Sequence, residues 1–296
     1  MDMIFDSHCH YNLEPLFSGK KSHFHLEDDA DILKKDWQNH WKKAQENGVK
    51  KSLIVGVDIQ SSQRALDIAQ TDQNLYASVG IHPTEAENIQ NVDDELKKLE
   101  ELIQNGDVSA IGEVGLDYFW LRDPNTKASL IQKQKKLFRE QIKIAQESML
   151  PLIVHVRDTE SPLQPTNNNA YWDALSILEE EYDSEKTGKK QFSPFVLHCV
   201  SGPLMYVLRA LELGGYVGFD GNLTYKKSKE LKKILRYSPF SRVLVETDAP
   251  YLPPQSHRGK ICEPWMIQET VQFIETEFGI DQETLWDNTV NFFGIK

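Results

Sequence analysis

The stretch Met3-Ile4-Phe5-Asp6-Ser7-His8-Cys9-His10 decides which fold the rest of the chain is expected to adopt. An apolar run leads into two histidines that are separated by one residue. On a β-strand, residues i and i+2 point to the same side, so His8 and His10 are expected to project together. Neutral imidazole is a common ligand for metal ions. The pair therefore indicates either a metal site or two ordinary histidines at a strand end.

Further strand-like runs follow, and helix-like runs separate them. After the first strand, we expect strands at 51–57, 77–83, 108–115, 150–156, 194–200, 216–219 and 242–247. We expect helices at 30–46, 61–69, 93–104, 129–148, 171–182, 204–213, 226–237, 264–277 and 281–293. Eight strands that alternate with helices, many of them apolar throughout, predict an α/β protein with a (β/α)₈ barrel of the TIM type. No boundary interrupts the pattern, so we expect one domain over 1–296 with extended loops and two C-terminal helices.

Metal-ligating and acidic residues recur where the predicted strands end. Because catalytic residues of (β/α)₈ barrels lie at the carboxyl ends of the strands, these side chains are expected to converge. They are His8, His10, His82, Glu113, His155, His198 and Asp248. The pattern predicts one site and favours the metal interpretation of the first two histidines. His23 and His25 repeat the same spacing without an apolar run before them, which favours a solvated loop over a second metal site.

The composition is typical of a globular protein in a reducing compartment. The chain has 296 residues, of which 40% are hydrophobic and 26% are charged. No apolar run approaches the roughly 20 residues that span a bilayer, and the N-terminus has no basic signal-peptide region. Three cysteines without CxxC spacing argue against a disulfide scaffold. We therefore expect a cytoplasmic protein with no membrane partner and no obligate protein partner, present as a monomer or weak oligomer.

The negative charge of the chain is unevenly distributed. The formal net charge is −12, yet residues 186–260 hold thirteen Lys and Arg against five Asp and Glu. Two of those five acids, Glu246 and Asp248, also lie beside the predicted site. The overall acidity therefore does not exclude a polyanionic substrate such as DNA.

Several motifs together resemble the TatD family of metal-dependent hydrolases, a branch of the amidohydrolase-like barrels. They cover residues 6 to 264, nearly the whole chain. The matching motifs are Asp6-Ser7-His8-Cys9-His10, Gly80-Ile81-His82-Pro83, Gly112-Glu113-Val114-Gly115-Leu116-Asp117-Tyr118, His155-Val156-Arg157, His198 before Ser201-Gly202, Glu246-Thr247-Asp248-Ala249-Pro250-Tyr251-Leu252 and, more weakly, Arg258-Gly259-Lys260 with Glu263-Pro264.

The resemblance implies a site for two divalent cations. His8, His10 and Asp248 would hold one ion, and Glu113 would bridge it to a second ion. The second ion would be held by His155 and His198. Family members are described as deoxyribonucleases that use magnesium or manganese, some of them acting as 3′→5′ exonucleases. Magnesium or manganese are the expected ions here, with zinc as the alternative.

The chemistry of phosphodiester hydrolysis suits these residues. Two cations about 3.5–4 Å apart can activate an attacking water and stabilise the leaving oxygen. A carboxylate can bridge two ions with its two oxygens, whereas a single imidazole nitrogen cannot, so Glu113 suits the shared position. Asp248 is the candidate for orienting or deprotonating the attacking water. The alternative for Asp248 is a structural carboxylate that caps the last turn of the barrel.

Four residues are candidates for contact with the substrate. His82 precedes a proline, which favours a position at the mouth, as a hydrogen-bond donor to a substrate phosphate, as a catalytic proton carrier or as a packed rim residue. Arg157 is a candidate phosphate clamp, or else the partner of Asp117 or Asp158 in an ion pair. Arg258 and Lys260 are expected to hold the nucleic-acid backbone or to be ordinary solvated charges.

An aromatic run and three loops bear on the substrate. Tyr118, Phe119 and Trp120 follow the fourth strand and would either stack on a base or pack against the rim. The loops at 14–29, 161–169 and 184–191 look longer than the family's usual connections, and Ile261-Cys262 departs from the family pattern. The motifs themselves leave three hypotheses: a deoxyribonuclease, a hydrolase of small amides or esters that include an aminoacyl-tRNA ester, and a metal-holding scaffold without activity.

Overall fold

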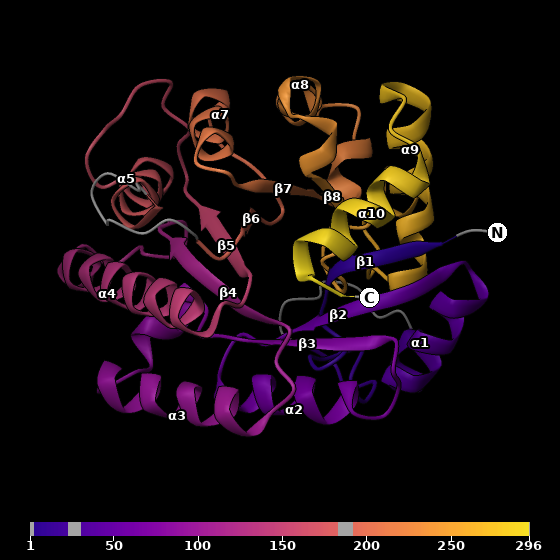
Figure 1. Cartoon of the computed structure of the whole chain (residues 1–296), viewed down its shortest axis with the longest axis horizontal. Coiled ribbons are helices and arrows are strands. Elements are labelled where there is room, and N and C mark those ends of the chain that lie inside the picture. Colours follow the sequence, from indigo (N-terminus) through magenta and orange to yellow (C-terminus); the bar gives the residue numbers. More distant parts are fainter. Residues whose placement is uncertain (1–2, 23–30, 183–191, 296) are drawn as a thin grey trace.

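The computed structural model describes residues 3–22, 31–182 and 192–295. Eight parallel strands lie in one sheet and follow one another in chain order, which confirms the predicted (β/α)₈ architecture (Figure 1). The strands are β1 (Ile4–Cys9), β2 (Val49–Val55), β3 (Leu75–Val79), β4 (Ala110–Asp117), β5 (Leu152–Arg157), β6 (Phe195–Leu197), β7 (Tyr216–Phe219) and β8 (Val243–Val245).

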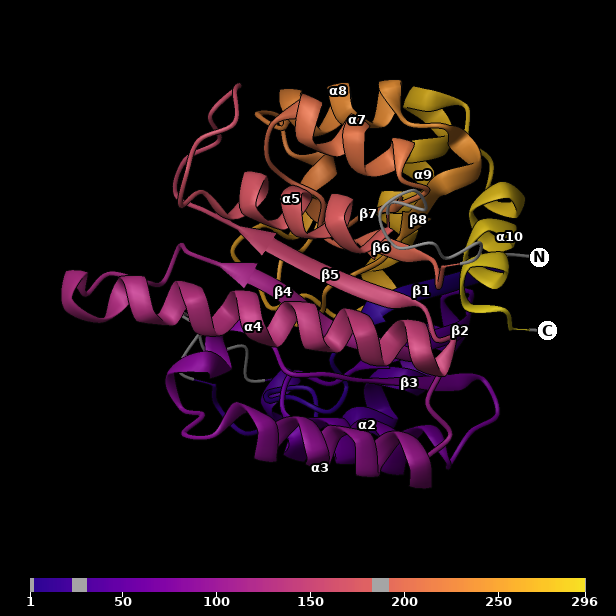
Figure 2. The ribbon, with the colours of Figure 1, turned by 60° about the vertical axis from the view of Figure 1, so that its left-hand side comes forward.

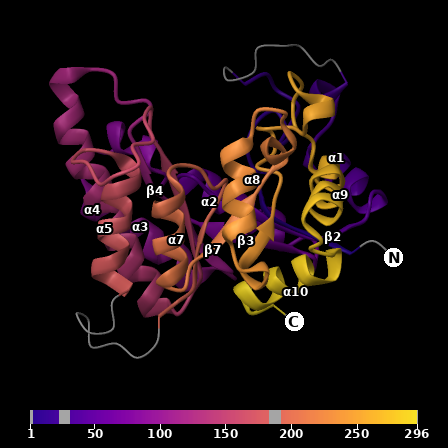
Figure 3. The same ribbon diagram turned by 90° about the horizontal axis from the view of Figure 1, so that it is seen from above.

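Helices lie between the strands along the chain and cover the outside of the sheet (Figures 1 and 3). The α-helices are α1 (Trp37–Glu46), α2 (Ile59–Ala69), α3 (Val92–Asn105), α4 (Pro124–Ser148), α5 (Ala170–Tyr182), α7 (Leu204–Glu212), α8 (Lys229–Tyr237), α9 (Ile267–Phe278) and α10 (Gln282–Phe293). Short 3-10 helices occupy Ile32–Lys34, Pro83–Glu87, Gly221–Thr224, Phe240–Arg242, Gln255–His257 and Pro264–Met266. No helix in the described part of the chain combines the length and apolar character that crossing a bilayer requires.

The gap between β8 and β1 is closed mainly just beyond the end of β8. Cys9 and Ala249 form an isolated parallel bridge. The backbone N–H of Asp248 donates to the carbonyl of His8 at 2.9 Å, and that of His10 donates to Ala249 at 2.9 Å. The segment that closes the barrel therefore also carries Asp248 to the side of the two histidines.

A layer of apolar side chains fills the barrel and α10 covers one end of it. Phe5 contacts both Trp286 and Phe293, with ring centroids 5.9 Å apart in each case. Strand residues that share this cluster are Leu53, Val55, Ala110, Ile153, Val196 and Leu244. Helix α10 lies at the end opposite the arrowheads of β4 and β5 (Figure 2). The carboxyl ends of the strands are thus left for the site.

Helix boundaries differ from the sequence predictions where side chains cap the backbone. The predicted helix 30–46 is divided into a 3-10 turn and α1, because Asp36 and Asn39 form a capping box that begins a new helix at Trp37. Helix α2 begins at Ile59, two residues earlier than predicted, because Asp58 is its N-cap. Helix α4 begins five residues earlier than predicted, at Pro124.

Some predictions concern residues that the structure does not describe, and one predicted strand ends earlier than expected. His23, His25, the start of the predicted helix at 30 and the loop 184–191 lie outside the described residues. The predicted strand 77–83 ends at Val79, so His82 lies in the connection beyond β3 and caps a 3-10 helix.

Candidate metal centre

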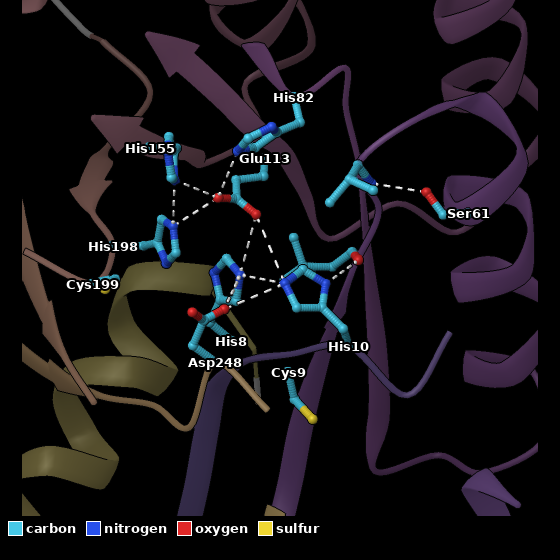
Figure 4. A network of polar contacts seen from close by, with 12 residues as sticks. His8, Cys9, His10, Ser61, His82, Glu113, His155, His198, Cys199 and Asp248 are labelled. Carbon is cyan, nitrogen blue, oxygen red and sulfur yellow. Dashed lines mark hydrogen bonds and ion pairs between the residues drawn. The ribbon is translucent and has the colours of Figure 1, made fainter. Parts of the chain in front are cut away.

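Glu113, on β4, lies between two pairs of histidines. Its Oε1 atom is 2.9 Å from Nδ1 of His155 and 2.8 Å from Nε2 of His198. Its Oε2 atom is 3.5 Å from Nε2 of His8 and 3.8 Å from Nε2 of His10. Figure 4 shows the carboxylate in the middle of the four rings. A carboxylate whose two oxygens face separate nitrogen pairs can take part in either of two groups of metal-ligating atoms.

Asp248 completes the first histidine pair. Its Oδ1 atom lies 3.4 Å from Nε2 of His10 and 3.7 Å from Nε2 of His8, and the two histidine nitrogens are 3.2 Å apart. The backbone of Asp248 has a φ of +53°, which is a left-handed conformation. Ligand atoms about 2.0–2.2 Å from a shared ion lie roughly 3.0–3.6 Å from one another. The spacing of this mixed N/O set fits a bound divalent cation.

Hydrogen bonds fix the ring orientation of two histidines. Nδ1 of His10 lies 2.9 Å from the carbonyl of Val55, which can only accept, so Nδ1 carries the proton and Nε2 presents its lone pair. Nε2 of His155 lies 3.2 Å from Oδ2 of Asp117, so in the neutral ring the proton lies on Nε2 and the lone pair of Nδ1 is the one that can bind an ion. Metal-binding histidines usually have such a partner on the other nitrogen. Both rings are therefore oriented as ligands.

The ring of His198 packs flat against that of His8, with centroids 3.9 Å apart and an interplanar angle of 11°. Its Nδ1 atom lies 3.6 Å from Oε1 of Glu246, which is too long for a hydrogen bond. The buried Glu246 carboxylate accepts the backbone N–H of Cys199 instead. Glu246 therefore contributes negative charge behind His198, at the end of β8.

Burial and the charges of neighbouring groups shift the pKa values of the carboxylates and histidines in the candidate metal centre. Burial raises the pKa of Glu113, but the charges of His198 and His82, with hydrogen bonds from His155 and His198, lower it well below its ordinary value of 4.5. Burial lowers the pKa of His198, but Glu113 and Glu246 raise it well above 6.5. Without a cation, the buried carboxylates therefore attract protons onto His10, His155 and His198, whose pKa values are raised, whereas burial lowers the pKa of His8. A divalent ion would replace those protons.

His82 differs from the four histidines above. The backbone N–H of Thr84 donates to its Nδ1 atom at 3.2 Å, and the Thr84 hydroxyl lies 2.7 Å from the same atom. Nδ1 is therefore an acceptor, and the proton of the neutral ring is on Nε2. Nε2 lies 3.5 Å from Oε1 of Glu113. His82 thus presents a donor to the centre instead of a lone pair for an ion.

The basic residues that were predicted to contact the substrate lie outside the group of histidines and carboxylates described above. The Arg157 guanidinium lies 4.0 Å from the ring centroid of Phe119, and neither Asp117 nor Asp158 forms an ion pair with it in the described part of the chain. Arg258 lies 4.9 Å from the ring of Tyr225. Both arginines and Lys260 are exposed. The structure does not bring Lys260 into contact with the centre.

Two buried glutamines on α4 position the strand ends, and the sequence analysis missed them. Gln134 accepts the backbone N–H of Asp117 at 2.9 Å and donates to its carbonyl at 3.0 Å. Gln141 does the same for Ile81 at 2.8 and 3.1 Å. Two glutamines seven residues apart, on the face of the helix that is otherwise apolar, were the available signal.

Asp220, just after β7, is a further acid that the sequence analysis missed. It is fully buried, and burial raises the pKa of its carboxyl to about 8. Its Oδ1 atom accepts the backbone N–H of Asn222 at 2.8 Å, whereas Oδ2 has no hydrogen-bond partner among the described residues. An acid directly after a predicted strand was again the signal.

Comparisons with known proteins agree with the motifs. A family model for TatD-related DNases matches residues 5–294. The uncharacterized metal-dependent hydrolase YcfH of Escherichia coli K12 is 33% identical over 290 residues, which cover 98% of this chain and 94% of that protein. The uncharacterized metal-dependent hydrolase YabD of Bacillus subtilis is 30% identical over 272 residues, with coverages of 92% and 90%.

Solved structures show the same fold. The crystal structure of YjjV, a TatD homologue from Escherichia coli, superposes with a TM-score of 0.77 at 24% identity and covers 99% of this chain and 98% of that chain. An uncharacterized amidohydrolase from Saccharomyces cerevisiae superposes with a TM-score of 0.74 at 20% identity, with coverages of 99% and 100%.

Proposed function

The chain belongs to the TatD-related DNase family of metal-dependent hydrolases, and from this we propose that it is a divalent-metal-dependent deoxyribonuclease. The proposed reaction is hydrolysis of a DNA phosphodiester bond by a water molecule, with nucleotides released in the 3′→5′ direction. The observation that carries the proposal is the position of Glu113, whose two oxygens face two separate pairs of histidines.

We assign the cations to two sets of ligands that share Glu113. His8, His10 and Asp248 would hold one ion, and His155 and His198 would hold the other. Two divalent ions, when bound, neutralise the phosphate and the charge that develops on the attacking and leaving oxygens. The carboxylate ligands suit magnesium or manganese, the proposed ions, whereas the imidazole ligands also suit zinc, and Cys9 contributes no thiolate because it points away from the centre (Figure 4).

Asp248 is the proposed base. Its side chain is 12% exposed, whereas that of Glu113 is 5% exposed, so of the two carboxylates Asp248 is the one that water reaches more readily. Burial raises its pKa, but His10, His8 and His198 lower it below the ordinary value of 3.8. The carboxylate is therefore ionised at neutral pH and can orient the attacking water and accept its proton.

His82 is the proposed donor to the substrate. Thr84 holds its Nδ1 atom as an acceptor, so the N–H at Nε2 faces the centre. In the neutral ring, this N–H can donate a hydrogen bond to a phosphate oxygen. The N–H at Nε2 of His82 faces Oε1 of Glu113, the oxygen that also faces His155. The ring centroids of His82 and His155 are 4.4 Å apart. His82 would then bind substrate next to the second cation.

The test is incubation of the metal-reconstituted protein with single- and double-stranded DNA, each labelled at either end. A panel of small amides and esters, together with an aminoacyl-tRNA, is assayed in parallel. We expect cleavage of DNA that is lost in EDTA, with a ladder that shortens from the 3′ end. Turnover of an amide or ester without DNA cleavage would replace the proposed substrate, and no turnover of any substrate by the loaded protein would contradict the proposal.

A further inference from the structure

Two arginines and two aromatic rings form a cluster beside the candidate metal centre. Arg157 lies 4.0 Å from the ring centroid of Phe119 and 5.6 Å from that of Trp120. Arg122 lies 5.6 Å and 5.5 Å from the same two rings. The rings meet edge to face, with centroids 4.9 Å apart. Phe119, Trp120, Arg122 and Arg157 are called the Arg–aromatic cluster below.

The cluster lies at the end of the barrel that carries the centre. Phe119 and Trp120 follow β4, the strand of Glu113, and Arg157 ends β5 two residues after His155. The first turns of α4, which begins directly after Arg122 and Asp123, project beyond the ends of these strands, away from α10 (Figures 2 and 3). A molecule bound in the centre would therefore lie beside the cluster.

Neither arginine of the cluster forms an ion pair with an acid in the described part of the chain. Neither guanidinium lies within 4.0 Å of a carboxylate of residues 3–22, 31–182 or 192–295. The nearest acids along the chain are engaged by backbone N–H groups: Asp117 accepts that of Phe119, Asp123 that of Asn125 and Asp158 that of Ala170. Two free cations are thus exposed at the mouth of a chain with a net charge of −12.

Other arginines in the described part of the chain also lie over rings, Arg64 over Phe17, Arg242 over Tyr216 and Arg258 over Tyr225, but each of them lies over a single ring and without a second arginine. Arg139 and Arg209 pair with glutamates, and Arg242 donates to two backbone carbonyls. Arg236 also lies over a ring, at 5.8 Å from Phe278, but it lies in the last turn of α8, which leads toward the start of β8. Arg236 is therefore a suitable control for Arg157, because it is also an arginine over a ring but lies far from the mouth residues in the sequence.

The ring of Trp120 supplies the apolar part of the cluster. Trp120 is 48% exposed. Tyr118, two residues earlier, is buried, and its hydroxyl donates to Asp173. An exposed indole beside free guanidinium groups matches the chemistry of a nucleotide, which combines a flat π-surface with a phosphate. A guanidinium that stacks on a ring keeps its N–H donors in its own plane, where a phosphate can reach them.

We infer that the Arg–aromatic cluster is a nucleotide-binding subsite, in which Trp120 stacks on the base next to the cleaved bond while Arg122 and Arg157 bind the adjoining phosphate. The inference rests on the proposed function, because it takes a DNA strand as the ligand. Stacking on an aromatic ring accepts any base, so the subsite adds affinity without sequence preference. Unpaired strands are favoured, because the base must leave its own stack to reach the ring.

The test is the binding of a fluorescein-labelled single-stranded pentanucleotide to the metal-loaded protein, followed by fluorescence anisotropy at several salt concentrations. Trp120→Ala should weaken binding by on the order of ten-fold, with no change in the salt dependence. Arg157→Ala and Arg122→Ala should each reduce the slope of log K against log salt by about 0.7. An abasic nucleotide at the contacted position should remove the effect of Trp120→Ala but not that of the arginine variants.

Two variants away from the mouth serve as controls. Tyr237, 61% exposed, ends α8, and Tyr237→Ala removes an exposed ring without touching the cluster. Arg236→Ala removes an unpaired guanidinium that lies over a ring. Both should bind the pentanucleotide as the wild type does. A merely electrostatic attraction would instead make Arg236→Ala resemble Arg157→Ala and leave Trp120→Ala unaffected, which would overturn the inference.

The labelled strand is finally analysed on a gel, which separates the inference from the proposed function. A strand that binds through the cluster but stays intact supports the subsite and contradicts the nuclease. Cleavage by the wild type, with unchanged binding in the Trp120, Arg122 and Arg157 variants, supports the nuclease and overturns the subsite. Absence of binding by the wild type also overturns the subsite.

Discussion

Asp117 holds the ring of His155 in the orientation that the candidate metal centre requires. The N–H at Nε2 of His155 donates to Oδ2 of Asp117 at 3.2 Å, and Nδ1 on the other side of the ring lies 2.9 Å from Oε1 of Glu113. Gln134 in turn holds the backbone of Asp117 from both sides. The orientation of one proposed ligand therefore depends on a carboxylate of β4 and an amide of α4.

Asp117→Asn should weaken metal binding by about ten- to a hundred-fold, as expected when the partner of a metal-binding histidine is lost. The amide removes the negative charge that orients the ring while it keeps the size of the side chain. Titration of the metal-free protein against a chelating indicator measures the effect. Asp123→Asn is the control, since Asn also caps a helix, and it should bind metal as the wild type does. Unchanged affinity in Asp117→Asn would remove this role.

Asp248→Asn should lower kcat by at least about a hundred-fold, because one positioned carboxylate at the reacting water is lost without a change in volume. Circular dichroism and elemental analysis of the same sample report the fold and the metal content. Near-native kcat in a variant that keeps its full metal content would exclude Asp248 as the base.

Metal uptake at neutral pH should release protons. Glu113 and Glu246 raise the pKa of His198 well above 6.5, so its ring is protonated in the metal-free protein at neutral pH, whereas a ligand must be neutral. Apparent affinity should therefore rise with pH until the raised pKa values of His198 and His155 are passed. Calorimetry in buffers of different ionisation enthalpy counts the protons. Affinity that is constant between about pH 6 and pH 8, with no proton released, would contradict this sign.

Gln134→Leu should lower the free energy of unfolding by about 2–4 kcal/mol, because it leaves the backbone N–H and carbonyl of Asp117 buried without this partner. Urea denaturation of the metal-free protein measures the loss. Gln132→Leu, at an exposed position of the same helix, should leave the midpoint nearly unchanged. Equal midpoints for the two variants would show that the glutamine does not anchor the strand end.

The sequence predicted the barrel and the converging residues because both depend on local patterns. His8, His10 and Glu113 are recognisable from the apolar strands β1 and β4, in which or next to which they lie. The break before Trp37 was not predictable from apolar periodicity, since the Asp36 side chain competes there with helix continuation. The roles of Asp117 and Gln134 were missed because their partners lie on other elements. The position of Arg157 over Phe119 is likewise set by the loop after β4.

The central claim is that Glu113 is shared by two cations, and anomalous scattering from crystals of the manganese-loaded protein tests it most directly. The account predicts two peaks about 3.5–4 Å apart, one beside Oε2 of Glu113 with His8, His10 and Asp248, the other beside Oε1 with His155 and His198. A single peak that leaves one histidine pair without metal, or peaks remote from Glu113, would contradict it.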